Sequence, residues 1–120
     1  MHMNNGLPHV LKLLQAAADE NRLRILKCLQ ARPACVCELV QATGMPQPRV
    51  SRHLRILRDA GLVADRRDAQ WVEYSLVQPR PESAEAKLLR LTLDELSQDG
   101  NVIADLARLA SASREECETS

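Results

Sequence analysis

Apolar side chains recur at helical spacing through the first quarter of the chain. Residues 8–17 place Val10, Leu11, Leu13, Leu14 and Ala17 at this spacing. Asp19 follows as an N-cap candidate, because its carboxylate can accept hydrogen bonds from the free N–H groups of a helix start. It predicts a second helix that ends near Gln30, with an apolar set of Leu23, Ile25, Leu26 and Leu29. We expect both helices to form core scaffold.

The next two predicted helices are joined by a tight turn. A short helix is expected at 36–43, closed by Gly44, the residue best suited to the left-handed position after a helix. A turn at Met45–Pro46 leads into a helix at 47–60, whose buried stripe is Val50, Leu54, Ile56 and Leu57. Two helices joined by such a turn have the helix-turn-helix layout.

After Gly61 the pattern changes from helical to alternating. Runs at 62–64 and 71–76 predict two antiparallel strands, with a hairpin tip made of Arg66, Arg67, Asp68 and Ala69. This hairpin is a wing beside the helix-turn-helix. The predicted fold class is therefore mainly α with a β-hairpin wing, a winged helix-turn-helix.

Two further helices are predicted beyond Pro79 and Pro81, at about 82–97 and 101–112, separated by Asp99–Gly100. The first of them is crowded with leucine at positions 88, 89, 91, 93 and 96. That is more apolar surface than a wing and four helices need for their own cover, so we expect a homodimer interface here. Packing within one chain is the alternative.

Length and composition indicate one domain. The chain has 120 residues, 45% of them hydrophobic, and only Trp71 and Tyr74 are aromatic, so the core must be aliphatic. We expect a disordered segment at 1–7, beginning with a probable cloning remnant, the domain at 8–112, and a disordered acidic tail at 113–120. No apolar run approaches the roughly 18 residues of a membrane span, and no secretory signal is evident, so a cytoplasmic protein without membrane association is expected.

Charge is unevenly distributed although the formal net charge is zero. Residues 44–67 hold six arginines against two aspartates, a local charge of +4, whereas residues 81–120 hold four basic and nine acidic residues, a local charge of −5. A basic middle and an acidic end confine a nucleic-acid footprint to one face.

Cys35 and Cys37 form the most distinctive chemical pattern. They fall where the helix at 36–43 should begin, and the positive end of a helix, with Arg32 nearby, lowers the pKa of thiols. We expect both to be partly thiolate at neutral pH and to prefer soft ions such as arsenic(III), antimony(III), cadmium or lead. Residues two apart on a helix point about 200 degrees apart, so one ion can bind both only if Cys35 lies at the cap or the first turn unwinds.

The other cysteines and the histidines have different expectations. Cys28 is expected to be a small core residue. Cys117 is either a third sulfur ligand or an exposed free thiol. The three histidines, His2, His9 and His53, do not supply a zinc site on the terminal helix.

Three stretches of the sequence carry a family resemblance. They are Asp19–Leu26 (DENRLRIL), Cys35–Leu39 (CVCEL) and Ser51–Val63 (SRHLRILRDAGLV). Over about residues 8–108 the chain resembles the ArsR/SmtB winged-helix metalloregulators, and in particular their arsenic-responsive repressors. Those repressors often carry a third cysteine three residues after the pair, where this chain has Val40.

The predicted DNA contacts lie on the helix at 47–60 and on the wing. The first exposed positions of that helix should enter the major groove and read base edges, namely Gln47, Arg49, Ser51 and Arg52. His53 is expected to support the helix or reach a phosphate, Arg55 and Arg58 to meet phosphates or acids of their own fold, and Arg66 and Arg67 to touch the backbone or minor groove. A merely solvated basic face is the alternative.

The sequence therefore predicts a homodimeric transcriptional repressor that binds double-stranded operator DNA. It should release the operator when arsenic(III) or antimony(III) binds Cys35 and Cys37, with Cys117 as a possible third ligand. Alternative interpretations are a repressor that senses cadmium, lead or oxidants with the same pair, a metal-free regulator and, from another class, a thiol redox enzyme.

Overall fold

The computed structural model describes residues 6–117, and the fold is mainly helical with a small sheet. In chain order the elements are α1 (Gly6–Ala17), α2 (Glu20–Ala31), β1 (Ala34–Cys35), α3 (Val36–Thr43), α4 (Gln47–Asp59), β2 (Val63–Asp68), β3 (Trp71–Leu76), α5 (Ala84–Asp94), α6 (Gly100–Ser111) and the 3-10 turn η1 (Arg114–Glu116).

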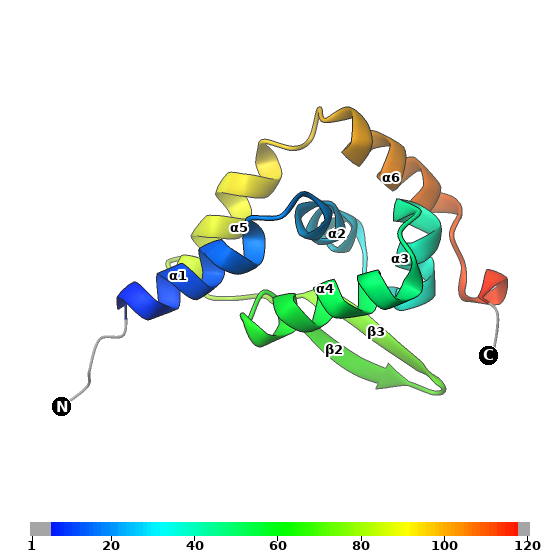
Figure 1. Cartoon of the computed structure of the whole chain (residues 1–120), viewed down its shortest axis with the longest axis horizontal. Helices are drawn as coiled ribbons and strands as arrows, with labels where there is room; N and C mark the ends of the chain where they lie inside the picture. Colours follow the sequence, from blue (N-terminus) through cyan, green and yellow to red (C-terminus); the bar gives the residue numbers. More distant parts are fainter. Residues whose placement is uncertain (1–5, 118–120) are drawn as a thin grey trace.

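Helix α2 lies at the centre, with the other helices around it and the β2–β3 hairpin on one side (Figure 1). Asp19 is its N-cap as predicted, and its Oδ1 accepts a hydrogen bond of 3.0 Å from the Arg22 backbone N–H. The side chains of Ile25 and Leu26 are fully buried. The apolar face of α2 therefore forms the middle of an aliphatic core, as the pattern predicted.

Helices α3 and α4 form the predicted helix-turn-helix. Gly44 ends α3 with φ of +76°, a left-handed conformation that glycine adopts without strain. The Thr43 hydroxyl donates to the Leu39 carbonyl at 2.7 Å and accepts from the Met45 N–H at 3.3 Å, which fixes the turn. Leu54 and Leu57 are fully buried, so α4 presents its opposite, polar face outward.

The hairpin is longer than predicted, and it has a third strand. Residues 66–68, expected at the tip, continue β2 in register with β3, and the turn is confined to Ala69–Gln70, where Ala69 has φ of +58°. The two-residue strand β1 pairs antiparallel with β3, giving the order β1-β3-β2. The sequence did not predict the full length of β2. Residues 64–68 are exposed and mostly charged, so they show no alternation of apolar and polar positions.

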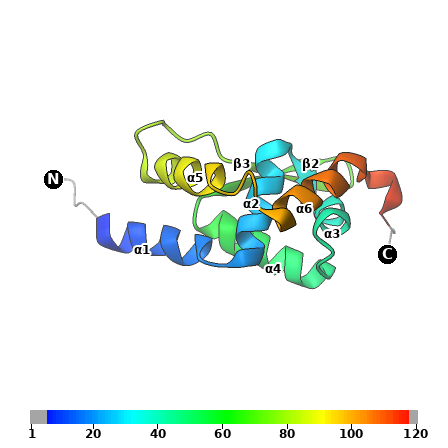
Figure 2. The ribbon, with the colours of Figure 1, turned by 90° about the horizontal axis from the view of Figure 1, so that it is seen from above.

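The prediction that the leucines of α5 form a dimer interface is partly wrong. Leu89 is only 7% exposed and packs into the core of its own chain together with the buried Leu93, whereas Leu91 is 70% exposed. The main exposed apolar residues lie on α1 instead, and they are Leu7, Val10, Leu11 and Leu14. Figures 1 and 2 place α1 beside α5, at the end of the molecule away from α3 and α6. The cause is that α5 bends back onto α1 and α2, and this packing uses its leucine stripe.

A buried ion pair joins α2 to α6. Asp105 on α6 is 1% exposed, and its two carboxylate oxygens each accept a 2.8 Å hydrogen bond from Arg24 on α2. Arg108 donates to the same carboxylate at 2.9 Å. The arginines also cap α3, because Arg24 donates to the Thr43 carbonyl at 2.9 Å and Arg108 to the Ala42 carbonyl at 2.7 Å.

Both predicted disordered ends contain some regular structure. Residues 6 and 7 belong to α1, and residues 114–116 form η1. The rest of these predictions, at 1–5 and 118–120 and including His2, lies outside the described residues. Among the helices that the structure describes, none has the length and apolarity to span a bilayer.

Candidate functional site

Two cysteines that are distant in the sequence meet at one edge of the fold. Cys37 lies in the first turn of α3, and Cys117 directly follows η1. The two are joined as a disulfide across 80 positions of sequence, with their Cα atoms 5.7 Å apart, a separation within the usual range for such a bond. Cys117, one of the uncertain cysteines in the sequence, is therefore the sulfur partner of Cys37.

Side-chain hydrogen bonds hold the segment that carries Cys117 against α3. The Gln41 amide binds the Ser113 backbone twice, donating to its carbonyl at 2.9 Å and accepting from its N–H at 3.2 Å. Arg32 donates to the carbonyls of Leu109 and Ala112 at 3.0 and 3.1 Å, which satisfies the C-terminal end of α6. The C-terminal segment is thus fixed by polar contacts rather than by a core.

Cys35 has the cap position that an ion shared with Cys37 requires, but its side chain is buried. It is the N-cap of α3 and only 2% exposed, and its backbone N–H donates to Glu38 Oε1 at 2.8 Å. Burial raises the pKa of its thiol, an effect that the nearby Arg114 offsets in part. This direction is opposite to the lowering of the Cys35 pKa that the sequence predicted. The expected helper, Arg32, pairs instead with Glu38 at 3.0 Å.

The structure separates the cysteines into a joined pair and two buried free thiols. Cys28 is fully buried, and burial raises its pKa to about 12, so the core role predicted for it is confirmed. Within residues 6–117, no three His, Cys, Asp or Glu side chains form a group that could hold a metal ion. The assignment of Cys35, Cys37 and Cys117 as ligands therefore stays a prediction, with the geometry supporting Cys37 and Cys117.

A pocket adjoins the joined pair and reaches the start of α4. It is lined by Cys37, Val40, Gln41, Gln47, Glu116 and Cys117. Val40 occupies the position of the third cysteine of the resemblance, so this pocket has an apolar wall where those proteins offer sulfur. Gln47, a predicted base reader, is exposed beside the thiols.

The predicted reading face of α4 is open to solvent. Gln47, Arg49, Arg52 and Arg55 are exposed and Ser51 is half-buried. A shallow hollow formed by Asp19, Asn21, Pro48, Arg49, Arg52 and His53 lies where the N-termini of α2 and α4 approach each other. The two arginines beside the start of α4 favour an anionic group such as a phosphate here, whereas the Asp19 carboxylate, which already caps α2, opposes one.

His53 is held inside this face rather than on it. Its side chain is buried, its Nδ1 lies 3.3 Å from Nη1 of Arg22, and burial lowers its pKa. Of the two roles expected for His53, the geometry favours support of the helix. Its contact with DNA stays a prediction.

The wing presents arginines of which one is already paired. Arg66 is 72% exposed and donates to Glu73 Oε1 at 2.9 Å, and Arg67 is exposed. Arg58 donates to Asp65 at 3.1 Å, in agreement with the expectation that it meets an acid of its own fold. The arginines of this surface are thus interleaved with carboxylates.

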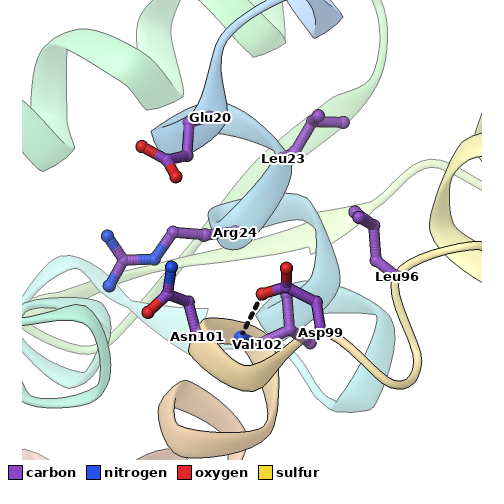
Figure 3. A pocket seen from close by; sticks show the side chains of 7 residues that line it. All are labelled: Glu20, Leu23, Arg24, Leu96, Asp99, Asn101 and Val102. Atoms are coloured by element: carbon purple, nitrogen blue, oxygen red, sulfur yellow. Dashed lines mark hydrogen bonds between the residues drawn. The ribbon is translucent and has the colours of Figure 1, made fainter.

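A second pocket lies between α2 and the α5–α6 connection (Figure 3). Two of its polar groups, Asp99 and Arg24, already have structural roles. Asp99 caps α6 by accepting from the Val102 N–H at 3.0 Å, and the Arg24 guanidinium is engaged by Asp105. This pocket therefore offers little chemistry for a ligand.

A family model described as "Bacterial regulatory protein, arsR family" matches residues 19–65, from the cap of α2 through the helix-turn-helix into the wing. The arsenic resistance transcriptional regulator ArsR1 of Pseudomonas putida is 44% identical over 90 residues, which cover 72% of this chain and 68% of that protein. The chain belongs to the ArsR family.

Two further similarities support this placement. The arsenical resistance operon repressor of Escherichia coli is 43% identical over 67 residues, 55% of this chain and 57% of that repressor, so the match spans little more than half of its length. The solved structure of HlyU from Vibrio cholerae superposes with a TM-score of 0.65 at 36% identity, covering 79% of this chain and 98% of that one. The ArsR family assignment confirms the predicted winged-helix fold and the prediction of a transcriptional regulator rather than an enzyme.

The sequence did not indicate the residues that hold the C-terminal segment. Gln41, Ser113 and Arg114 belong to no motif, and the polar composition after α6 predicted disorder. The one feature of the sequence that pointed to this segment was Cys117, a soft sulfur ligand in an otherwise polar tail.

Alkylation of the reduced protein tests the different states of the thiols. We expect iodoacetamide at neutral pH to label the half-buried Cys37 and Cys117 first, because the thiolate is the nucleophile and access is required. A pKa of about 12 against an ordinary 9.0 leaves Cys28 with about a thousandfold less thiolate. Mass spectrometry of timed digests measures the order. Early labelling of Cys35 or Cys28 would contradict these positions.

Arg52→Ala tests the reading face. If Arg52 reads a base, the loss should be about 1 to 3 kcal/mol on the preferred inverted repeat, with relaxed preference at one position. Anisotropy titrations against DNA selected from random sequence measure both quantities, and Arg90→Ala on α5 is the control for removing one exposed arginine. An equal loss on every sequence would assign Arg52 to phosphate.

Proposed function

We propose that this ArsR-family regulator binds operator DNA as a homodimer in the cytoplasm and releases it when arsenic(III) or antimony(III) binds Cys37 and Cys117. The observation that carries the proposal is the meeting of these two sulfurs beside Gln47, at the start of the predicted recognition helix. The names of the arsenic resistance relatives support the choice of inducer.

The donor set suits a thiophilic ion. Arsenous acid condenses with two thiols, so that each sulfur replaces one hydroxyl, the thiol protons leave in two water molecules, and one hydroxyl stays on arsenic. The sulfur atoms of Cys37 and Cys117 lie close enough to be joined directly, so a small movement apart makes room for one such ion between them. Soft thiolates prefer it over hard cations.

Cys35 completes the site only at a structural cost. Because it already lies at the cap, the first turn of α3 need not unwind, but its side chain has to leave a buried position to reach an ion on Cys37. A three-sulfur site would therefore act on the helix-turn-helix directly, whereas a two-sulfur site acts through the C-terminal segment. Both couplings fit an inducer that favours a state with lower operator affinity.

A second candidate function follows from the disulfide itself. Cys37 and Cys117 could be the sensor of an oxidant: two thiols give up two protons and two electrons, and hydrogen peroxide, for example, is reduced to two water molecules. The favouring observation is the bond between the two sulfurs. The same segment is fixed in either case, so the two functions differ in the signal and share the response.

Operator release by each signal decides between these functions. Arsenite in the presence of a phosphine reductant should release the wild-type protein, and Cys37→Ser or Cys117→Ser should bind operator normally but stay bound, because the inducer loses its preference for the released state. Cys28→Ser is the matched control, since that thiol is buried in the core. Anisotropy with labelled operator measures release.

Three results would change the proposal. Release by peroxide but not by arsenite would assign the redox function. Release that survives in the Cys37→Ser, Cys117→Ser double variant would remove the pair from sensing. Loss of arsenite release in Cys35→Ser would instead place a third sulfur in the site.

We assign the dimer interface to the exposed apolar face of α1 together with Leu91 of α5. Leu7, Val10, Leu11 and Leu14 leave a continuous helix face uncovered, and burial of such a face is worth about 25 cal/mol per Å². The interface lies at the opposite end from the thiol pair (Figure 2). A two-fold dimer would present two α4 helices to operator half-sites roughly 10 base pairs apart.

Leu11→Glu and Leu91→Glu should each give monomers that bind operator much more weakly, because each monomer keeps half of the contacts. Ile103→Glu on α6 is the control, since Ile103 is similarly exposed but lies away from α1. Sedimentation velocity measures the mass of each variant. Dimers in both α1 and α5 variants would refute this interface.

A further inference from the structure

The turn that carries Cys117 also carries the residue that reaches the wing. Arg114 Nη1 donates to Asp68 Oδ2 at 2.9 Å, and Arg114 Nη2 donates to Glu73 Oε2 at 2.7 Å. Asp68 ends β2 and Glu73 lies on β3, so one guanidinium grips both strands of the hairpin. Its Nε is 3.7 Å from Glu38 at the start of α3.

Glu73 links this contact to a DNA-facing arginine. Its second oxygen, Oε1, accepts from Arg66 at 2.9 Å, so Arg66 and Arg114 occupy the two oxygens of one carboxylate. Glu73 is also the residue of β3 that pairs with Cys35 of β1. The position of Arg114 thus bears on an arginine predicted to touch the DNA backbone.

The contact depends on the position of the C-terminal segment. Beyond Ala112 this segment has no buried apolar residue among those described, and it is placed by Gln41, Arg114 and the Cys37–Cys117 bond. Surface ion pairs are individually weak in water, and their strength rises when a covalent link keeps the partners together. Joining or separating the sulfurs therefore changes how firmly Arg114 holds the hairpin.

We propose that Arg114 is the positioning residue that transmits the state of the Cys37–Cys117 pair to the wing. When the two sulfurs are joined, directly or through a thiophilic ion, η1 is fixed and Arg114 clamps Asp68 and Glu73. The wing is then held toward the C-terminal segment, with Arg66 engaged by Glu73. When the sulfurs separate, the clamp loosens and the wing can adjust to the DNA backbone.

This inference rests on the proposed thiol sensor, and it adds a route distinct from the direct one at Gln47. The pocket next to the cysteines touches the start of α4, but it does not include the wing. Arg114 alone connects the Cys117 turn to β2 and β3 by hydrogen bonds between the described residues. The two routes can therefore be separated by substituting Arg114.

The test compares Arg114→Gln with Arg80→Gln in the full-length reduced protein. Arg80 is a surface arginine that pairs with Glu82 at 3.3 Å. Its variant therefore removes the same charge but leaves the contacts of the wing intact. Three quantities are measured with arsenite and, separately, with peroxide: reaction of the thiols, the ratio of operator dissociation constants with and without the probe, and the emission of Trp71. Trp71 is the only tryptophan and pairs with Asp68 across the hairpin.

In wild type and Arg80→Gln we expect the probe to weaken operator binding and to shift Trp71 emission. In Arg114→Gln the thiols should react to the same extent, while the ratio falls by at least about fivefold, a typical coupling magnitude, and the emission shift is lost. Asp68→Asn combined with Glu73→Gln should reproduce these losses from the wing side.

An unchanged ratio and an unchanged Trp71 response in Arg114→Gln would overturn the proposal. Absence of operator release in the wild type would count against the sensor function, whereas the link to the wing is judged from Trp71 emission, which is measured without DNA. If oxidised wild type then shifts Trp71 emission and oxidised Arg114→Gln does not, the link from the thiols to the wing stands and the sensor function falls. If neither shifts, the link falls.

Discussion

The buried carboxylate of Asp105 is the constraint on which the arrangement of this protein depends. A charge with 1% exposure is tolerated only with full compensation, and Arg24 and Arg108 supply it through three hydrogen bonds of 2.8 to 2.9 Å. The same arginines bind the last carbonyls of α3. Breaking such a buried pair by removing one partner typically costs about 3 to 5 kcal/mol. The carboxylate therefore fixes α6 against α2 and the helix-turn-helix together.

Because α6 is held in place, it determines where the short polar C-terminal segment begins. Only five residues separate the end of α6 from Cys117, so the reach of that thiol is set by where the helix stops. Arg32 fixes this end by binding the carbonyls of Leu109 and Ala112. Beyond it the contacts are polar and partly exposed, which are features of segments that open at low free energy. A firmly packed helix thus places a less stable C-terminal segment beside α3.

Two predictions of the sequence failed for the same reason, the burial of side chains by elements distant in the chain. The pKa of Cys35 was expected to be lowered because helix starts stabilise anions, but Cys35 is buried where β1 pairs with β3, and desolvation raises its pKa. Leu89 was assigned to an interface because leucine was in surplus on α5, but α5 packs back on the core. The main exposed apolar residues lie instead on α1, a helix that had been expected to form core scaffold.

The sequence by itself determined the helix-turn-helix, the wing and the family, because caps, the glycine after α3 and the apolar period act over a few residues. It also determined that Cys37 offers a soft ligand near the start of α3. Only the tertiary structure decided that Cys117 rather than Cys35 meets Cys37, and that Arg114 reaches the wing. These contacts span between 41 and 80 positions of sequence. No local pattern encodes them, because they depend on where the buried Arg24–Asp105 pair places α6.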